Sequence, residues 1–294
     1  LQTGSFLMRS YDFIIVGTGA GGLTAALHAA RHGTVCVLTK RAASDSNSSW
    51  AQGGIACVQG DDDSIEQHVS DTLIAGAGLC KEDAVRTIVS EGPERIAEII
   101  DWGVHFDQKE ATDGHLEFDL TREGGHSKRR VLHALDATGK EVTEKLIAAV
   151  AAHPNIEVLE NHFAIDLITT AKLGLVSEDR CLGLYVLNET TGEVDTFRSD
   201  RVILATGGCG RVYLYTTNPS IATGDGVATV VVATDVAIAG VVTTVSGMPC
   251  PTGTHARCRP RISNAGWPLR SQTVAFQCEA AASVETGSAQ RSTR

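Results

Sequence analysis

Apolar positions near the start of the chain predict a strand, a helix and a second strand in direct succession. An apolar run ends at Val16, the alanine-rich stretch 23–32 has helical character, and 34–39 is apolar again. Further helices are predicted after Ser64 and over about 81–102. Another is predicted from Thr138, because Thr138 and Glu141 form a capping-box pattern. The chain therefore opens as a β-α-β unit and continues into helices.

The pattern changes between residues 156 and 204, where short apolar segments alternate with turn residues. Strands are predicted over 156–160, 163–169, 182–188, 194–198 and 201–205. Together with the opening unit, these segments predict an α/β fold, namely a Rossmann-like domain with a parallel sheet plus a β-meander. The pattern leaves the order of the strands open.

Between the first strand and the first helix, Gly17, Gly19 and Gly22 have the spacing of a dinucleotide-binding turn. The first permits the tight turn, the second lets backbone approach a pyrophosphate, and the third lets the helix pack on the strand. The helix N-terminus then offers N–H groups and partial positive charge to the phosphates. The second strand is followed by Lys40, with no acidic residue before Asp45 to bind a ribose. The turn thus predicts a dinucleotide and disfavours an ordinary NAD dehydrogenase.

Composition limits the partners of the chain. Its 294 residues carry a formal net charge of −10, which argues against a nucleic-acid surface. Eight cysteines without a C-x-x-C pair predict reduced thiols and a cytoplasmic protein. The histidines lack metal-ligand spacing, so no metal is expected. The longest apolar stretch, 227–245, is interrupted by Asp235 and threonines, so no membrane segment is expected.

Three further motifs follow the glycine turn in order. They are Asn47-Ser-Ser-Trp-Ala-Gln-Gly-Gly-Ile-Ala56, Thr121-Arg-Glu-Gly-Gly-His126, and Ala205-Thr-Gly-Gly208 with Thr223-Gly-Asp-Gly226. The four motifs together closely resemble those of the L-aspartate oxidases, flavoproteins of the succinate dehydrogenase and fumarate reductase superfamily. The resemblance covers residues 10–228.

The resemblance implies that the chain binds FAD and oxidises L-aspartate to iminoaspartate, the first step of de novo NAD biosynthesis. A hydride passes from the substrate Cα to flavin N5, oxygen or fumarate reoxidises the flavin, and iminoaspartate passes to quinolinate synthase. The cofactor-binding residues that it implies are Gly17, Thr18, Gly19, Ala20, Gly21, Gly22, Lys40, Asn47, Ser48, Ser49, Trp50, Ala51, Gln52, Gly53, Gly54, Thr206, Gly207, Gly208 and Asp225.

Some of these assignments have local alternatives. Adjacent glycines let backbone approach a flat ring system, yet Gly53 and Gly54 also fit a simple tight turn. Asp225 between two glycines also fits an Asx-turn. Asn47 stands near the place where the succinate dehydrogenase branch carries a histidine bonded covalently to the flavin. Asparagine cannot form that bond, so the resemblance implies non-covalent FAD.

Glu123 is the catalytic residue that the resemblance implies, with the role of orienting the substrate. An α-ammonium about 4 Å from a carboxylate gains roughly 4 kcal/mol at an effective dielectric constant near 20, whereas succinate would be repelled. The local alternative is a Glu123 paired with an arginine on a solvated loop. His126 is either a substrate or flavin contact or a structural residue. A basic cluster supplies positive potential for an anionic ligand or forms a solvated face; its members are Arg122, Lys128, Arg129 and Arg130.

The resemblance ends near residue 228, which predicts three regions. These are an N-terminal extension over 1–9, an FAD-binding domain over 10–228, and an aberrant or divergent, poorly ordered tail over 229–294. Residues 246–294 contain six arginines, two glutamates and no lysine, unlike the acidic remainder. An out-of-frame ending and a divergent cap are alternative explanations of the tail.

The capping domain, the proton-donating arginine and the helical domain of the family are not recognisable in the tail. We therefore expect impaired activity, since hydride transfer needs a closed site with little water. Two other functions stay open: a flavoprotein of the fumarate reductase or succinate dehydrogenase type, and a non-catalytic fragment.

Overall fold

A parallel four-stranded sheet forms the centre of the protein. The computed structural model describes residues 8–111, 114–135, 137–175, 180–232, 258–260 and 276–278. The strand order is β12 (Val202–Leu204), β2 (Phe13–Val16), β3 (Val35–Leu38) and β8 (Ile156–Leu159). All neighbours run parallel. Because the sheet is covered on both faces, β3 is buried along its whole length, which explains its uninterrupted apolar run.

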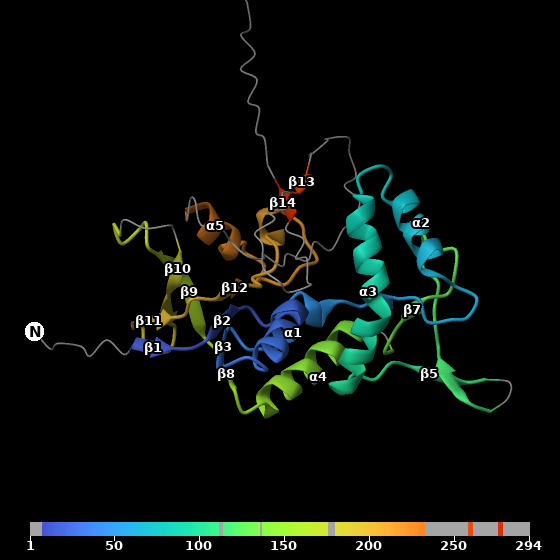
Figure 1. Ribbon diagram of the computed structural model, residues 1–294, viewed down its shortest axis with the longest axis horizontal. Helices are drawn as coiled ribbons and strands as arrows, with labels where there is room; N and C mark the ends of the chain where they lie inside the picture. The colour runs from blue at the N-terminus through green and yellow to red at the C-terminus, as the bar shows by residue number, and fades with distance from the viewer. Residues whose placement is uncertain are drawn as a thin grey trace, which may run out of the picture.

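Helices cover one face of this sheet. They are α1 (Ala20–Ala29), α3 (Glu82–Asp101) and α4 (Thr138–Ala152). Leu23, Ile96 and Leu146 from the three helices pack into one core with Ile15 and Val37 of the sheet. Figure 1 shows α1 and α4 side by side, in agreement with their direct contacts. The helical periodicity of the sequence therefore corresponds to a real buried stripe on each helix.

A second sheet covers the opposite face, with the order β1 (Met8–Ser10), β11 (Val194–Arg198), β10 (Cys181–Asn188) and β9 (His162–Thr169). Strands β9 to β11 form an antiparallel meander, and β1 pairs parallel with β11. Ile14 and Leu38 pack there against Leu184 and Phe197. Ile14 and its neighbour Ile15 enter different cores because successive side chains of a strand point to opposite faces. The result is three layers (Figure 1).

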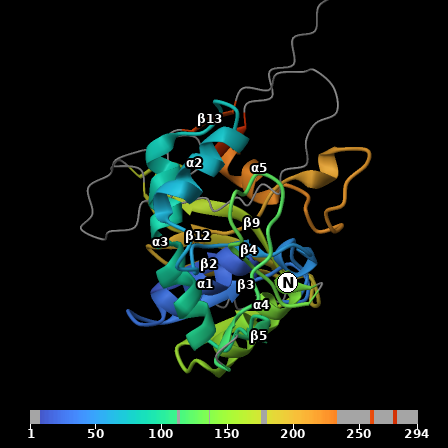
Figure 2. The ribbon, with the colours of Figure 1, turned by 90° about the vertical axis from the view of Figure 1, so that its right-hand side faces the viewer.

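Smaller elements lie around these layers. Helix α2 (Ile65–Ala75) packs beside α3, as Figure 2 shows. The others are η1 (Ser48–Trp50), β4 (Ile55–Ala56), β5 (Gln108–Glu110), β6 (Leu116–Phe118), β7 (Val131–Leu132), η2 (Gly210–Val212), α5 (Asp225–Val232), β13 (Cys258–Pro260) and β14 (Phe276–Cys278). Antiparallel pairs join β4 to β7, β5 to β6 and β13 to β14.

The predicted α/β class, with its parallel sheet and meander, is confirmed. The first helix begins at Ala20, three residues before the predicted start. The capping box is wrong, because Thr138 already lies inside α4 and its Oγ1 accepts from the Ala134 N–H at 3.1 Å. Glu141 Oε1 instead accepts from the His105 N–H at 3.1 Å.

The ends of the chain are described in part. Met8 and Arg9, within the expected extension, form β1 with Ser10. Helix α5 continues across residue 228 to Val232. Residues 233–257, 261–275 and 279–294 of the expected tail lie outside the described residues.

Candidate functional site

A groove lies at the carboxyl ends of β2, β3 and β12. Its lining includes 17–22 after β2, 38–40 at the end of β3 and 204–207 at the end of β12. The groove contains about 1030 Å³ of empty space, with the open solvent at its mouth included. In parallel α/β sheets, ligands bind outside the carboxyl ends of the strands. The fold therefore places the predicted dinucleotide turn where a ligand is expected.

Two glycines of the turn are required by close backbone approach. Gly17 has φ +115°, and a methyl group there would lie 2.2 Å from the Ala205 carbonyl oxygen. A methyl group at Gly22 would lie 2.0 Å from the Gly17 carbonyl oxygen. Larger residues would push α1 away from β2 and β12. These positions thus bear out the packing role that the spacing predicts.

The N-terminus of α1 faces this groove. Its N-cap residue Gly19 provides no side-chain cap, and its first turn has no acidic residue. The Ala20 N–H donates to Ser48 Oγ at 3.0 Å, which brings the 47–54 segment to the helix start. The helix dipole is therefore not neutralised by a carboxylate of its own first turn, and an anionic group would be favoured there.

Three residues that line the groove each have a buried side-chain oxygen without a protein partner. Among the described residues, Thr18 Oγ1, Asn47 Oδ1 and Thr206 Oγ1 are in this state, and all three residues line the groove. Buried polar atoms are rarely left unpaired, because each costs about 1–3 kcal/mol of desolvation. Three such atoms in one groove fit a polar ligand with several hydrogen-bonding groups.

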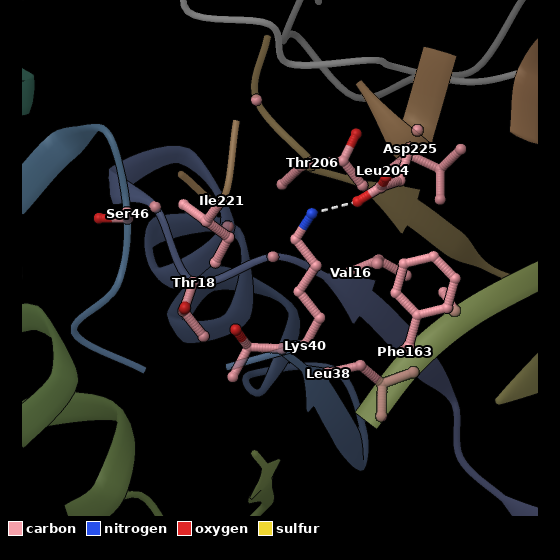
Figure 3. Close-up of a pocket in the computed structure, with 18 of the residues that line it drawn as sticks. Val16, Thr18, Leu38, Lys40, Ser46, Phe163, Leu204, Thr206, Ile221 and Asp225 are labelled. Carbon is pink, nitrogen blue, oxygen red and sulfur yellow. Dashed lines mark hydrogen bonds and ion pairs between the residues drawn. The ribbon is translucent and has the colours of Figure 1, made fainter. Parts of the chain in front are cut away.

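Lys40 and Asp225 meet at another wall of the groove. Lys40 Nζ forms an ion pair with Asp225, the first residue of α5, as the dashed line in Figure 3 shows. Lys40 Nζ also donates to Thr223 Oγ1 at 2.6 Å. Two sequence-distant candidates are thus brought together, one from the end of β3 and one from the start of α5.

Strand β9 supplies a wall that the sequence analysis missed. His162, Phe163, Ala164 and Asp166 line the groove, and Figure 3 shows Phe163 on this strand near Leu38. The His162 N–H donates to the Thr39 carbonyl at 2.9 Å and so fixes the start of β9 at the end of β3. The available signal was the short turn between β8 and β9, which must place the start of β9 at the carboxyl edge.

The predicted cofactor residues fall into two groups. Those that line the groove are Gly17, Thr18, Gly19, Ala20, Gly21, Gly22, Lys40, Asn47, Ser48, Thr206, Gly207 and Asp225. The groove lining does not include Ser49, Trp50, Ala51, Gln52, Gly53, Gly54 and Gly208. The 49–54 part of the second motif instead leads away from the groove to β4.

Glu123 lies beside that outer part of the second motif. It is exposed, and a methyl group at Gly53 would lie 3.6 Å from its Oε1 atom. The His126 N–H donates to the Glu123 carbonyl at 3.2 Å, which closes a tight turn. Gly125 has φ +87° at the third position of this turn, where glycine is favoured. The adjacent glycines of the motif therefore shape the turn that presents Glu123.

The basic cluster does not act as one surface. Arg130 is completely buried, with Nε and Nη2 each 2.7 Å from Asp63 and Nη1 2.7 Å from Asp71. Both interpretations of the cluster are therefore wrong for Arg130. Lys128 pairs with Asp62 at 3.1 Å, and Arg129 Nε donates to the Leu120 carbonyl at 2.8 Å.

The carboxylates around Arg130 are strongly stabilised in their charged form. Burial acts to raise the pKa of Asp71, but hydrogen bonds from Ser127 and Arg130 outweigh it and hold that pKa far below its usual value. Burial likewise acts to raise the pKa of Asp63, but the hydrogen bonds from Arg130 lower it, and the net effect is a lowered pKa. The pKa of His68 is lowered mainly by burial, then by the charges of Arg130 and His126.

Metal and membrane features can be examined for the described residues. Within those ranges no group of three or more His, Cys, Asp or Glu side chains is arranged to hold a metal ion. No described helix combines the length and apolar character that a membrane crossing requires.

A comparison with known families identifies the family of the chain. Residues 12–260 match the family described as FAD binding domain. The chain belongs to this FAD-binding family. The match extends beyond residue 228, where the motif resemblance ends.

Within the family, the chain is a homologue of the L-aspartate oxidases. It is 54% identical to L-aspartate oxidase 1 of Ralstonia nicotianae over 219 residues, which are 74% of this chain and 40% of the relative. It is 50% identical to L-aspartate oxidase of Pseudomonas aeruginosa over 74% of this chain and 41% of the relative. The chain thus spans about two fifths of the length of these curated relatives.

Solved structures show the same architecture. Quinol fumarate reductase of E. coli matches with a TM-score of 0.67 and 32% identity, over 74% of this chain and 36% of that chain. The Sdh1 complex of Mycobacterium smegmatis matches with a TM-score of 0.69 and 28% identity, over 77% and 39%. The α/β fold predicted from the periodicity, and the FAD-binding family that the four motifs imply, are therefore confirmed.

Proposed function

We propose that this chain binds FAD non-covalently and carries the cofactor-binding part of an L-aspartate oxidase, a cytoplasmic enzyme that forms iminoaspartate. When bound, FAD would supply a hydride acceptor for the substrate Cα, and oxygen or fumarate would serve as the final electron acceptor. The product would pass to quinolinate synthase. The single observation that carries the cofactor proposal is the set of three unpaired buried polar atoms around the N-terminus of α1.

The residues of the groove fit a dinucleotide in a consistent order. Backbone N–H groups of the turn after Gly17 and the positive end of α1 would bind the pyrophosphate. Thr18, Asn47 and Thr206 would donate or accept hydrogen bonds to the polar groups of the cofactor. Lys40 would lie near the adenosine half of the cofactor. Asp225 would contact the cofactor from the 223–226 segment at the start of α5. Asn47 has no atom that bonds covalently to a flavin, which supports a dissociable cofactor.

Glu123 would select the substrate. Its carboxylate stands exposed beside Gly53, so an α-ammonium group can approach it from solvent. Because this carboxylate is exposed, solvent screening reduces the attraction at a separation of about 4 Å to roughly 1 kcal/mol, and the same carboxylate repels a plain dicarboxylate. Glu123 would therefore favour aspartate over succinate.

The test is a flavin absorbance spectrum of the purified full chain, recorded after FAD loading and desalting. Retained flavin, lost on acid precipitation, supports non-covalent binding. Bleaching of the flavin band by anaerobic L-aspartate then supports the oxidase reaction. A colourless protein refutes the cofactor assignment, and retained flavin that aspartate does not bleach refutes the reaction for this chain.

A fumarate reductase or succinate dehydrogenase type activity is the second candidate. It is favoured by the structural similarity to E. coli quinol fumarate reductase at 32% identity. Flavin bleaching by succinate but not by aspartate would support it. A Glu123→Gln variant separates the two candidates, because it should weaken use of aspartate and leave or improve that of succinate.

A further inference from the structure

The loop that carries Glu123 lies along one face of α2. Three helix positions meet it, at 68, 71 and 75, which share a face because they are three and four residues apart. The His126 and His68 rings lie 5.7 Å apart, and a methyl group at Gly125 would be 3.4 Å from Ala75 Cβ. The loop is thus in contact with α2 over two turns.

Polar contacts fix the middle of this loop. Asp71 Oδ2 accepts from the Ser127 N–H at 2.8 Å and from Ser127 Oγ at 2.7 Å. The same oxygen accepts from Arg130 Nη1 at 2.7 Å. Asp71 is buried and negatively charged, so these are charge-assisted hydrogen bonds of the stronger kind.

Arg130 extends the attachment to the start of α2. Its other nitrogens form a bidentate pair with Asp63, which directly precedes the N-cap residue Ser64. A single buried guanidinium therefore joins the loop to both the beginning and the middle of the helix. Lysine cannot make this fork of parallel hydrogen bonds.

The neck of the loop is fixed against the second motif. Thr121 N–H donates to the Val131 carbonyl at 2.9 Å, and Arg130 N–H donates to the Thr121 carbonyl at 3.1 Å. Strand β7 pairs with β4, and a methyl group at Gly54 would be 2.2 Å from the Leu132 carbonyl oxygen. With its neck and its side fixed, the loop keeps its turn, and hence Glu123, next to Gly53.

We propose that Asp71, Ser127 and Arg130 are positioning residues that hold Glu123 beside the 47–54 segment and thereby set the preference for an amino diacid. This inference rests on the proposed function. Gly124 and Gly125 make the turn intrinsically pliable, because glycine has the largest backbone freedom in the unfixed state. The contacts with α2 remove that freedom.

The test uses Ser127→Ala in the full chain, because this change deletes one hydroxyl and leaves the buried charges in place. Hydrogen exchange, followed by mass spectrometry, should be about tenfold faster in peptides covering 121–130. In the FAD-loaded chain, the aspartate concentration that gives half-maximal flavin bleaching should rise about tenfold. The inhibition constant of succinate for this bleaching should stay within twofold. Ser127→Thr keeps the hydroxyl and should restore both readouts.

Ser64→Ala is the matched control, because it removes the hydroxyl of the N-cap residue of α2 and leaves the carboxylates of Asp63 and Asp71 in place. It loses the cap to the Gln67 N–H at 3.2 Å and should leave aspartate half-saturation unchanged. Unchanged loop exchange in Ser127→Ala, an unchanged aspartate response, or the same response in Ser64→Ala would each overturn the inference. So would a loaded wild-type chain that does not distinguish aspartate from succinate. A wild-type chain that retains no flavin would instead refute the proposed function itself.

Discussion

Replacement of Gly22 by alanine tests whether close packing at the dinucleotide turn is needed for the stability of the fold. It does so separately from any test of ligand binding. The added methyl group would lie 2.0 Å from the Gly17 carbonyl oxygen and 3.2 Å from Ala205 Cβ. The oxygen belongs to backbone, so no side-chain rotation relieves the contact. Helix α1 must move away from β2 by about 1.5 Å to reach an ordinary van der Waals separation of about 3.5 Å.

Two opposed effects set the magnitude. Alanine inside a helix gains about 1 kcal/mol over glycine. Overpacking against a well-packed core costs about 1–3 kcal/mol, and a rigid backbone neighbour places this site at the upper end. We therefore expect Gly22→Ala to lower the free energy of unfolding by about 2 kcal/mol. For a domain of this size, that corresponds to a fall in Tm of about 4–8 °C.

Gly19→Ala is the matched control for the same turn. A methyl group there would lie 3.3 Å from Ser48 Oγ, the end of a small side chain, so the fold should tolerate it. The methyl group would, however, occupy space next to the N-terminus of α1. Urea unfolding followed by circular dichroism should show a loss for Gly22→Ala and little change for Gly19→Ala, whereas FAD titration should show weaker binding for Gly19→Ala. A Gly22→Ala chain as stable as the wild type would refute the close-packing argument.

Three further outcomes are expected. Gly54→Ala, whose methyl group would lie 2.2 Å from the Leu132 carbonyl oxygen, should lose about 2 kcal/mol in urea unfolding. Gly124→Ala, with no atom within 4 Å, should change stability by less than about 0.5 kcal/mol, and equal losses would contradict the geometry. Lys40→Met should weaken FAD binding about tenfold in a fluorescence titration, and an unchanged dissociation constant would remove Lys40 from the site. Burial lowers the pKa of His68 below 6.5, so the unfolded chain takes up a proton first. Stability should therefore fall as the pH drops from 6.5 toward that lower pKa, and His68→Asn should flatten this part of the profile.

The layers of the fold were predictable because the apolar residues of each strand and helix follow a regular spacing within that segment. Strand β3 is apolar at every position and is buried on both faces, while α4 buries Val142, Leu146 and Val150 at intervals of four. The glycine turn was equally predictable, since the need for glycine at position 17 comes from its positive φ angle as well as from packing. Short-range patterns of this kind depend little on the rest of the chain.

Interactions between distant segments were not predictable in the same way. Arg130 follows three charged or polar neighbours and looks solvent-exposed in sequence, yet its partners Asp63 and Asp71 lie 59 or more residues away. Phe163 was assigned to a strand, but its own segment does not show that the strand starts at the groove, which follows only from the short turn after β8. Both cases depend on which segments the sheet order brings together, and the periodicity of a single segment carries no record of that.

The failed capping box shows how one motif can satisfy a different requirement. Gly139, its second residue, is needed because a methyl group there would lie 2.0 Å from the Ser48 carbonyl oxygen. The Gly139 N–H also donates to the Ala51 carbonyl at 2.9 Å, so the first turn of α4 packs against the second motif and is hydrogen-bonded to it.

The 47–54 segment is therefore held at three points before any ligand binds. Ser48 Oγ accepts from the Ala20 N–H at its start, Gly139 donates to Ala51 at its middle, and Gly54 lies against Leu132 at its end. A loop fixed in this way loses little conformational entropy when a cofactor arrives, and such preorganisation raises affinity without any added contact. It also means that the outer residues 49–54 need not line the groove to matter. Their contacts with Gly139 of α4 and Leu132 of β7 fix the segment that begins with Asn47 and Ser48, and those two residues do line the groove.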